Sequence, residues 1–258
     1  MPLKVILLCY YPAYRNRAQA EAGALLKALG RSPQHDLTIV CNNPETMRAG
    51  DLPGPDPRSE FAGWKAGLDH LQGYQGPVLF LNDTFCHHHR WSALDRFRLI
   101  RRLHGTEAQH PYFMLGEVNR GATALTFLDR PLPHWISTYC FYVGPALAEG
   151  LSDILVLPEA AFTTLVRGVH QGRILWGPAA APALAEHLDS WLTPGPHDHW
   201  YRAGQVSDDA LAAKLKSILN EFWLSARCLE LGAALSPFRT LGDGFHLRLS
   251  GLRRRLRA

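Results

Sequence analysis

The sequence predicts an α/β fold in which helices cover both faces of a mostly parallel sheet. Three apolar runs, at residues 4–10, 36–41 and 77–81, have the length of strands and are continuous rather than alternating. Such runs are typical of strands buried on both faces. Segments with helical spacing separate them. Strands joined by helices pair in parallel, so these observations predict a central parallel sheet, followed by a helical C-terminal part.

The first two strands and the helix between them are well marked. Lys4–Tyr10 (KVILLCY) predicts the first strand, and Asn16–Leu29 predicts a helix that Gly30 ends as a C-cap. Asp36–Cys41 (DLTIVC) predicts the second strand. Residues 42–58 hold four prolines and two glycines, which predicts a loop without regular structure.

A second helix and a third strand follow this loop. Ser59 is expected to cap a helix that runs through Leu71, with Glu60 in its first turn. Pro77–Leu81 (PVLFL) predicts the third strand, which leads into a polar tripeptide, Asn82-Asp83-Thr84. The later elements are expected to be an amphipathic helix at Trp91–Leu103, strands at Tyr112–Leu115 and residues 134–143, and helices at Ala179–Leu192 and Asp208–Leu231.

Charge is distributed unevenly along the 258 residues. The net charge is +4, but residues 239–258 contain six arginines and one aspartate, a charge of +5 that leaves −1 on the rest. A near-neutral body argues against a nucleic-acid binder, whose charge would spread over a folded face. We therefore expect a single domain at residues 1–238, a basic tail at residues 239–258, and no nucleic-acid partner.

The tail has the pattern of a basic amphipathic helix. Phe245, Leu249, Leu252 and Leu256 are spaced by four, three and four residues among five arginines. This pattern indicates attraction to anionic lipid, and a solubilising tail or a helix packed on a partner is the alternative.

The chain shows no membrane-spanning or secretory signal. Its longest stretch without charged residues, Pro131–Ala148, is interrupted by prolines, and the apolar start at residues 5–9 is too short for a signal peptide. The five cysteines are odd in number and lack C-x-x-C spacing. We expect a cytoplasmic protein with reduced cysteines in its core, peripheral on the inner face of the plasma membrane if the tail binds lipid.

Ligands of an open α/β sheet bind beyond the carboxyl ends of its strands. Tyr10, Tyr11 and Pro12 follow the first strand, and Asn42 follows the second. Two aromatic rings and a proline suit a stacked base. The chain has no G-x-G-x-x-G after the first strand and no P-loop, so neither a Rossmann dinucleotide site nor a P-loop is predicted.

Asp83 lies at the end of the third strand as a lone carboxylate between two polar side chains. This position suits a ligand to a divalent cation that holds a diphosphate. The alternative is that Asn82-Asp83-Thr84 only turns the chain and caps the next segment.

Four segments, taken together, resemble bacterial glycosyltransferases of the rhamnan synthesis F type. Glu60–Leu68 (EFAGWKAGL) and Val78–Thr84 (VLFLNDT) are similar to the family's acidic-aromatic helix and to the strand that ends in a DxD variant. Residues 134–141 (HWISTYCF) are similar to its His-x-x-Ser-Tyr-Phe strand, with Thr138 as an extra residue, and residues 216–225 (KSILNEFWLS) are similar to its Glu-x-x-Leu-Ser helix. The segments occur in the family's order.

This resemblance implies a GT-A-type, Rossmann-like fold and a hexosyl- or deoxyhexosyltransferase. The enzyme would move a sugar from a nucleotide-sugar to a glycan or lipid-linked glycan in bacterial surface polysaccharide such as capsule, O-antigen or rhamnan. Mn²⁺ or Mg²⁺ is the implied metal. A catalytically inactive module that binds glycan or nucleotide is the alternative, favoured by the single acid of Asn82-Asp83-Thr84.

The resemblance and the chemistry of transfer assign roles to particular residues. Asp83 is expected to hold the cation on the leaving phosphates, with residues 87–90 (HHHR) as alternative phosphate contacts. Glu221 is expected to be the general base, unless it is a solvent-facing helical residue. Glu117 and Asp129 are alternative bases, because both lie near strand ends.

The remaining predicted site residues fall into two groups. The residues expected to contact the nucleotide-sugar are Tyr10, Tyr11, Pro12, Asn42, Glu60, Lys65, Asn82 and Thr84. The residues expected to contact the acceptor are His134, Ser137 and Tyr139. The alternatives are ordinary strand packing for the acceptor group and a solvated helical lysine for Lys65.

Overall fold

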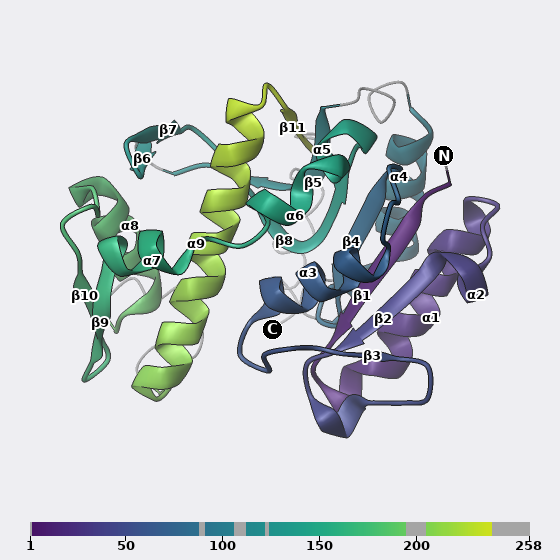
Figure 1. Cartoon of the computed structure of the whole chain (residues 1–258), viewed down its shortest axis with the longest axis horizontal. Helices are drawn as coiled ribbons and strands as arrows, with labels where there is room; N and C mark the ends of the chain where they lie inside the picture. The colour runs from purple at the N-terminus through teal and green to yellow at the C-terminus, as the bar shows by residue number, and fades with distance from the viewer. Residues whose placement is uncertain (1, 88–90, 106–111, 122–123, 195–204, 239–258) are drawn as a thin grey trace, which may run out of the picture.

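A mixed sheet forms the centre of the protein in the computed structural model, which describes residues 2–87, 91–105, 112–121, 124–194 and 205–238 (Figure 1). Its strands are β1 (Lys4–Cys9), β2 (Leu37–Cys41), β3 (Leu52–Pro53), β4 (Val78–Asn82), β5 (Phe113–Asn119), β8 (Trp135–Val143) and β11 (Ala234–Pro237). The strand order is β11-β5-β8-β4-β1-β2-β3. Strand β8 is antiparallel to both neighbours, and the other pairs of this sheet are parallel. The predicted α/β class with a mostly parallel sheet is confirmed.

Helices and two small hairpins surround this sheet. The helices are α1 (Pro12–Ala28), α2 (Pro33–Asp36), the 3₁₀ helix η1 (Pro44–Thr46), α3 (Glu60–His70), α4 (Ala93–His104), α5 (Pro145–Glu149), α6 (Leu151–Ile154), α7 (Glu159–Leu165), α8 (Pro182–Leu192) and α9 (Asp208–Glu230). The hairpins pair β6 (Leu125–Phe127) with β7 (Arg130–Leu132) and β9 (Val166–His170) with β10 (Arg173–Trp176).

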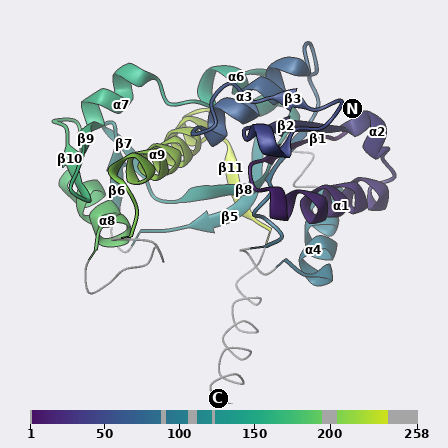
Figure 2. The same ribbon diagram turned by 90° about the horizontal axis from the view of Figure 1, so that it is seen from below.

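Helices cover both faces of the sheet, and Figure 2 shows α1 and α4 on one side with α3 and α6 on the other. One face of β1 packs Val5 and Leu7 against α1 and α4, and the other packs Ile6 and Leu8 against α3. Strand β1 is therefore buried on both faces, which is why its sequence is continuously apolar. A third apolar cluster joins α7, α8 and both hairpins to the long helix α9.

The order of strands reverses at β1. From β1 the chain moves through β2 to β3 on one side, whereas β4 pairs with the opposite edge of β1. The carboxyl ends of β1 and β4 therefore lie side by side at a topological switch point, where open α/β sheets leave a crevice for ligands.

Several boundaries differ from the predicted ones. Helix α1 begins at Pro12 rather than Asn16, because proline fits the first helical position, where its missing N–H leaves no unmade bond. The loop at residues 42–58 was predicted to lack regular structure, and this is wrong: it contains η1 and β3. Strand β3 has only two residues and forms because β2 supplies its hydrogen-bonding partner.

The caps and cysteines follow the prediction more closely. The hydroxyl of Ser59 accepts a hydrogen bond from the N–H of Ala62 and begins α3 as expected. All five cysteines are buried, and none of them forms a disulfide. No helix within the described ranges has the length and hydropathy needed to cross a membrane. The predicted tail helix, Phe245–Leu256, lies outside the described residues.

Candidate functional site

A cavity of about 570 Å³ opens at the switch point between β1 and β4. Most residues predicted to contact the nucleotide-sugar line it, namely Tyr10, Tyr11, Asn42, Glu60, Asn82 and Thr84. Asp83, the predicted metal ligand, lines it as well. The opposite wall consists of residues 206–217 at the start of α9, together with the loop that precedes α3. Segments more than a hundred residues apart in the sequence thus enclose one space.

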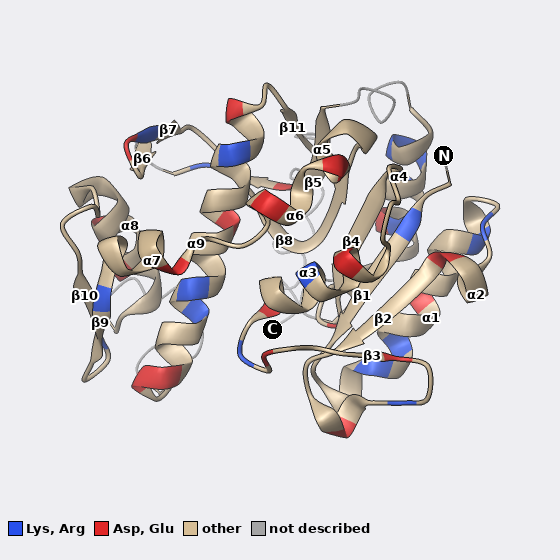
Figure 3. Ribbon diagram, viewed as in Figure 1, with Lys and Arg blue, Asp and Glu red and all other residues tan. Residues whose placement is uncertain are grey.

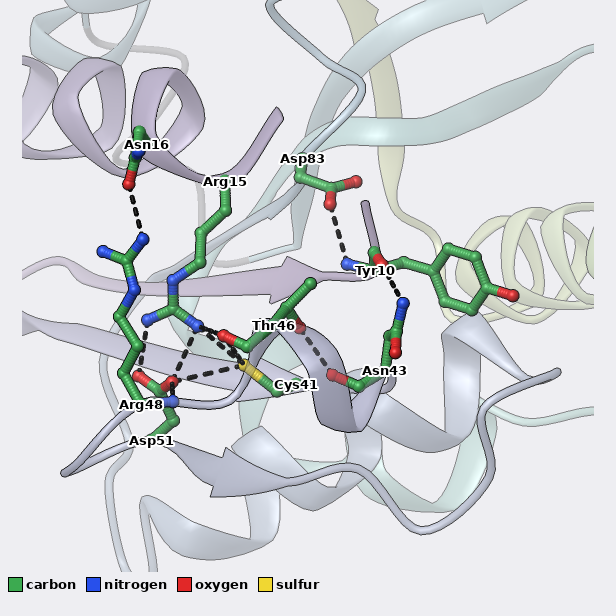
Figure 4. A network of polar contacts seen from close by, with 9 residues as sticks. All are labelled: Tyr10, Arg15, Asn16, Cys41, Asn43, Thr46, Arg48, Asp51 and Asp83. Atoms are coloured by element: carbon green, nitrogen blue, oxygen red, sulfur yellow. Dashed lines mark hydrogen bonds and ion pairs between the residues drawn. The ribbon is translucent and has the colours of Figure 1, made fainter. Parts of the chain in front are cut away.

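Asp83 fixes the turn between β1 and α1. Its Oδ2 atom accepts hydrogen bonds from the backbone N–H groups of Tyr10 (2.7 Å) and Tyr11 (2.6 Å), as Figure 4 shows for Tyr10. Burial raises the pKa of Asp83 to about 6, and these two N–H donors oppose the rise. The side chain therefore lines the cavity and also holds the turn between β1 and α1, a backbone contact that was not predicted for it.

Tyr10 is held from both sides of its backbone. Asn43 Nδ2 donates to the carbonyl oxygen of Tyr10 (2.9 Å), while Asp83 accepts from its N–H (Figure 4). Tyr10 and Tyr11 are 41% and 39% exposed as residues, and their rings meet edge to face with centroids 4.9 Å apart. A rigid backbone that presents exposed aromatic rings at a cavity suits stacking on a planar ligand group.

Glu60 joins three elements at the cavity wall. Its carboxylate accepts hydrogen bonds from Asn82 Nδ2 on β4 and from the hydroxyl of Ser217 on α9. Asn82 in turn accepts hydrogen bonds from the N–H and the hydroxyl of Thr84. Burial raises the pKa of Glu60. The result is a carboxylate of fixed orientation among hydroxyl and amide groups.

Glu221 lies on α9 at the position four residues beyond Ser217, on the same helical face. Its Oε1 atom accepts hydrogen bonds from the N–H (3.0 Å) and the hydroxyl (2.9 Å) of Thr138 on β8. Burial raises the pKa of Glu221 to about 7, with a smaller contribution from the like charge of Glu60, while Lys214 opposes the rise. Glu221 is thus a partly buried carboxylate one helical turn beyond the cavity residue Ser217, and both of its hydrogen bonds from Thr138 hold it against β8 rather than in solvent.

Two predicted donor contacts lie away from the cavity lining. Pro12 begins α1, and its role there is the helix start. Lys65 binds Asp69 one turn along α3 (2.9 Å) and donates to Ser152 (2.7 Å). These contacts match the alternative of a helical lysine at the surface.

The predicted acceptor residues do not line this cavity either. Ser137 accepts a hydrogen bond from Asn119 Nδ2 (2.9 Å), and Tyr139 is 5% exposed within the apolar cluster under α1. His134 is partly buried, and burial lowers its pKa. Neighbouring Thr138, the extra residue of this strand, is the one that contacts a predicted catalytic group.

The alternative site residues also lie outside the lining. Glu117 is part of β5, and Asp129 occupies the β6–β7 turn with a positive φ of 62°. The ring of His87 stacks on Tyr14 at a centroid distance of 4.1 Å. Residues 88–90 are not among the described residues.

Ten residues of the cavity lining were not predicted as contacts, and Arg58, Lys214 and Ser217 are among them. Arg58 comes from the loop before α3, and Lys214 and Ser217 come from α9. Lys214, Ser217 and Glu221 are spaced by three and four residues, which is the spacing of one helical face. That polar stripe was readable in the sequence, but the cavity that it faces was not.

Few side-chain oxygens in the cavity are available to bind the implied divalent cation. Asp83 Oδ2 already accepts two N–H groups, and both oxygens of Glu60 accept hydrogen bonds from protein groups. Among the described residues, no group of three or more His, Cys, Asp or Glu side chains could hold a metal ion. These residues do not match the ligand set of a tightly bound resident cation.

Comparison with family models, with curated proteins and with solved structures finds no match to this chain.

Proposed function

We propose that this chain is a glycosyltransferase with a GT-A-type fold, which moves a sugar from a nucleotide-sugar to a glycan or lipid-linked glycan in bacterial surface polysaccharide synthesis. One observation carries the proposal: the cavity lies at the switch point of the sheet and gathers most of the predicted donor contacts. Its volume of about 570 Å³ lies within the usual range of small-molecule sites.

The cavity offers groups for each part of such a donor. The exposed rings of Tyr10 and Tyr11 would stack on the base. Glu60 and Ser217 would hydrogen-bond to sugar hydroxyls, because a carboxylate accepts and a serine hydroxyl both donates and accepts. Fixed orientation of Glu60 by Asn82 lowers the entropy lost when the sugar binds.

In the proposed reaction, an acceptor hydroxyl bonds to the anomeric carbon while the bond from that carbon to the diphosphate breaks. A carboxylate takes the proton of the hydroxyl. We assign this role to Glu221, because it lies one helical turn beyond the cavity residue Ser217 and burial raises its pKa to about 7, which suits a general base near neutral pH. Glu60, which lines the cavity, is the alternative base.

Binding tests the first half of the proposal. We would measure the melting temperature with a panel of nucleoside diphosphates and nucleotide-sugars, with and without Mn²⁺, since a ligand of the native state raises it. We expect at least one nucleotide to stabilise the wild type and a Tyr10→Ala/Tyr11→Ala variant to lose the effect. Tyr112→Ala is the matched control, because this tyrosine is 40% exposed and lies outside the cavity lining. A panel without any stabilising nucleotide would refute the proposal.

Turnover tests the second half. We expect slow hydrolysis of the nucleotide-sugar that binds, and a fall of about 100-fold or more in Glu221→Gln with nucleotide affinity retained. Glu60→Gln shows whether the cavity carboxylate acts instead.

Nucleotide binding without hydrolysis of any donor would favour the second candidate, a catalytically inactive binding module. The observation in its favour is that Asp83 Oδ2, the expected metal ligand, is already bound to the backbone of Tyr10 and Tyr11.

We also propose that the protein works in the cytoplasm at an anionic membrane surface, to which its basic tail, residues 239–258, attaches it. The support is the arginine-rich amphipathic pattern of the tail.

A further inference from the structure

Five charged side chains line the cavity: Arg58, Glu60, Asp83, Asp209 and Lys214. Three of these side chains are acidic and two are basic. An anionic ligand can bind only if the acidic side chains have partners in the protein and a basic side chain remains available. Figure 3 shows that α9, which forms one wall, carries acidic residues at its start and basic residues further along.

Each acidic side chain has a partner in the protein. Glu60 accepts hydrogen bonds from Asn82 and Ser217, and Asp83 accepts from two backbone N–H groups. Asp209 forms an ion pair with Arg58 at 3.5 Å, in which the side chains are 76% and 71% exposed. An exposed pair of this kind is weak, so Arg58 can leave Asp209 at little cost.

Lys214 differs from Arg58. Its ammonium group forms no ion pair with the described residues, and it lies 5.8 Å from the centroid of the Trp191 ring of α8. Its positive charge acts on Glu60 and Glu221, where it opposes the rise in pKa that burial causes. The cavity wall therefore carries one cation that is partly buried and is not neutralised by a direct ionic contact within the described residues.

We propose that Lys214 binds the diphosphate of the nucleotide, with Arg58 as a second contact, and that this binding needs no divalent cation. The inference rests on the proposed function, because it assumes a nucleotide in this cavity. An ammonium on a flexible stem binds phosphate oxygens as a point charge and adapts to their positions. Asp83 and Glu60 already accept hydrogen bonds from protein groups, so they are poor ligands for a cation that would balance the diphosphate. The positive charge that balances the diphosphate therefore comes from Lys214 of α9.

The test compares a nucleoside with its diphosphate, using the base that gives the largest rise in melting temperature. Calorimetry would give both dissociation constants for the wild type, Lys214→Met, Lys214→Arg and Lys216→Met, in EDTA and in Mg²⁺. Methionine keeps an apolar stem against Trp191, and arginine keeps the charge. Lys216 is the matched control, because it lies on the same helix, pairs with Glu159 at 2.7 Å and does not line the cavity.

The measured quantity is the preference for diphosphate over nucleoside. We expect it to fall about 10- to 100-fold in Lys214→Met, the usual effect of losing a charged hydrogen bond, and to stay within about threefold in Lys214→Arg and Lys216→Met. EDTA should leave the wild-type preference unchanged. An unchanged preference in Lys214→Met, or its collapse in EDTA, would overturn the inference while the proposed function stands. A wild type that binds neither nucleoside nor nucleotide would overturn the proposed function and the inference with it.

Discussion

At the scale of single residues, the clearest role of Asp83 is to hold the backbone of the turn after β1. Its Oδ2 atom accepts the N–H groups of Tyr10 and Tyr11, and these two residues carry the exposed rings of the cavity. The carboxylate is 1% exposed, and its pKa is raised to about 6 by burial. The position of both rings therefore depends on an acceptor atom at residue 83.

Two replacements of Asp83 distinguish its role as a hydrogen-bond acceptor for the Tyr10 and Tyr11 N–H groups from the effect of its negative charge. Asp83→Asn keeps an oxygen in place for the two N–H groups, whereas Asp83→Ala leaves both without their acceptor. We expect Asp83→Ala to lower the free energy of unfolding by about 1–3 kcal/mol and Asp83→Asn to lower it by less, as measured by urea denaturation. Equal losses in both variants would show that the charge matters and the hydrogen bonds do not.

Glu221 predicts a pH dependence of stability. Its pKa in the folded protein, about 7, is higher than the ordinary value of 4.5, so the unfolded chain releases this proton first as pH rises. The stabilising contribution is complete below about pH 4.5 and is lost between pH 4.5 and 7.

We therefore expect the melting temperature of Glu221→Gln to fall less than that of the wild type between pH 4.5 and 7.5. Glutamine cannot ionise, but its amide oxygen still accepts from Thr138. The raised pKa values of Glu60 and Asp83 add the same trend in both proteins, so the difference between the two profiles reports Glu221 together with its interaction with Glu60. Parallel pH profiles would contradict the prediction.

At the scale of elements, α3 lies very close to the sheet because it has glycines on its buried face. A Cβ atom on Gly67 would lie 2.6 Å from Cγ2 of Ile6 and 3.0 Å from Cγ2 of Val40. One turn earlier, a Cβ on Gly63 would lie 2.5 Å from a methyl group of Leu8. Close contact with the strands places the start of α3, including Glu60, at the cavity.

Gly67→Ala should lower the free energy of unfolding by up to about 2 kcal/mol, because an overpacking cost of about 1–3 kcal/mol outweighs the gain of about 1 kcal/mol in helix propensity. Gly23→Ala in α1 is the matched control. A Cβ there would meet only Pro33, at 3.8 Å, so this change should raise stability by about 0.4–1 kcal/mol. Chemical denaturation checks both signs, and stabilisation by Gly67→Ala would show that α3 can move away from the sheet.

Helix α1 is connected to the loop after β2 through a buried ion pair. Arg15 is 2% exposed and binds both carboxylate oxygens of Asp51, at 2.7 and 2.9 Å (Figure 4). The same guanidinium donates to Cys41 Sγ and to the carbonyl oxygen of Thr46. This loop, although rich in proline and glycine, is thus fixed to the helix.

Removal of one partner of this pair leaves a buried charge without compensation. We expect Arg15→Met to lower the free energy of unfolding by about 3–5 kcal/mol, and Asp51→Asn to lower it as well. A double-mutant cycle should show coupling, with the double variant less destabilised than the sum of the single variants. Additive losses would indicate that the two residues act separately.

At the scale of the whole molecule, the cavity joins parts of the chain that are distant in sequence. Glu60 and Ser217, which both line it and hydrogen-bond to each other, are separated by 157 positions. Thr138 and Glu221, which hydrogen-bond outside the lining, are separated by 83. The strand ends supply one wall and α9 supplies the other. A ligand in this space would therefore stabilise the packing of α9 on the sheet.

The basic tail gives a prediction for the whole chain. Deletion of residues 239–258 removes a charge of +5 and leaves a body with a charge of −1. We expect the deletion variant to lose flotation with liposomes that contain anionic lipid, and the full chain to lose it in high salt. Liposomes of neutral lipid are the control. Equal flotation of the full and shortened chains would exclude the tail as the anchor.

The sequence alone predicted the elements whose residues have a clear local pattern. The continuous apolar runs of β1, β2 and β4 and the Ser59 cap of α3 were found because periodicity and capping depend on near neighbours. Residues at the carboxyl ends of these strands, such as Tyr10 and Asn82, were found for the same reason. The short strands β3 and β11 and the strands of both hairpins were not predicted, because each forms by pairing with another strand and has too few residues to show an apolar pattern of its own.

Only the tertiary structure decided which of the polar residues meet. That β8 runs antiparallel, that α9 brings Lys214 and Ser217 to the cavity, and that Asp83 binds backbone N–H groups all depend on contacts between distant segments. Local sequence fixes the period and the ends of an element, but the burial of one apolar surface against another fixes its neighbours. The strand ends of the candidate site were therefore readable from the sequence, and the wall that α9 contributes was not.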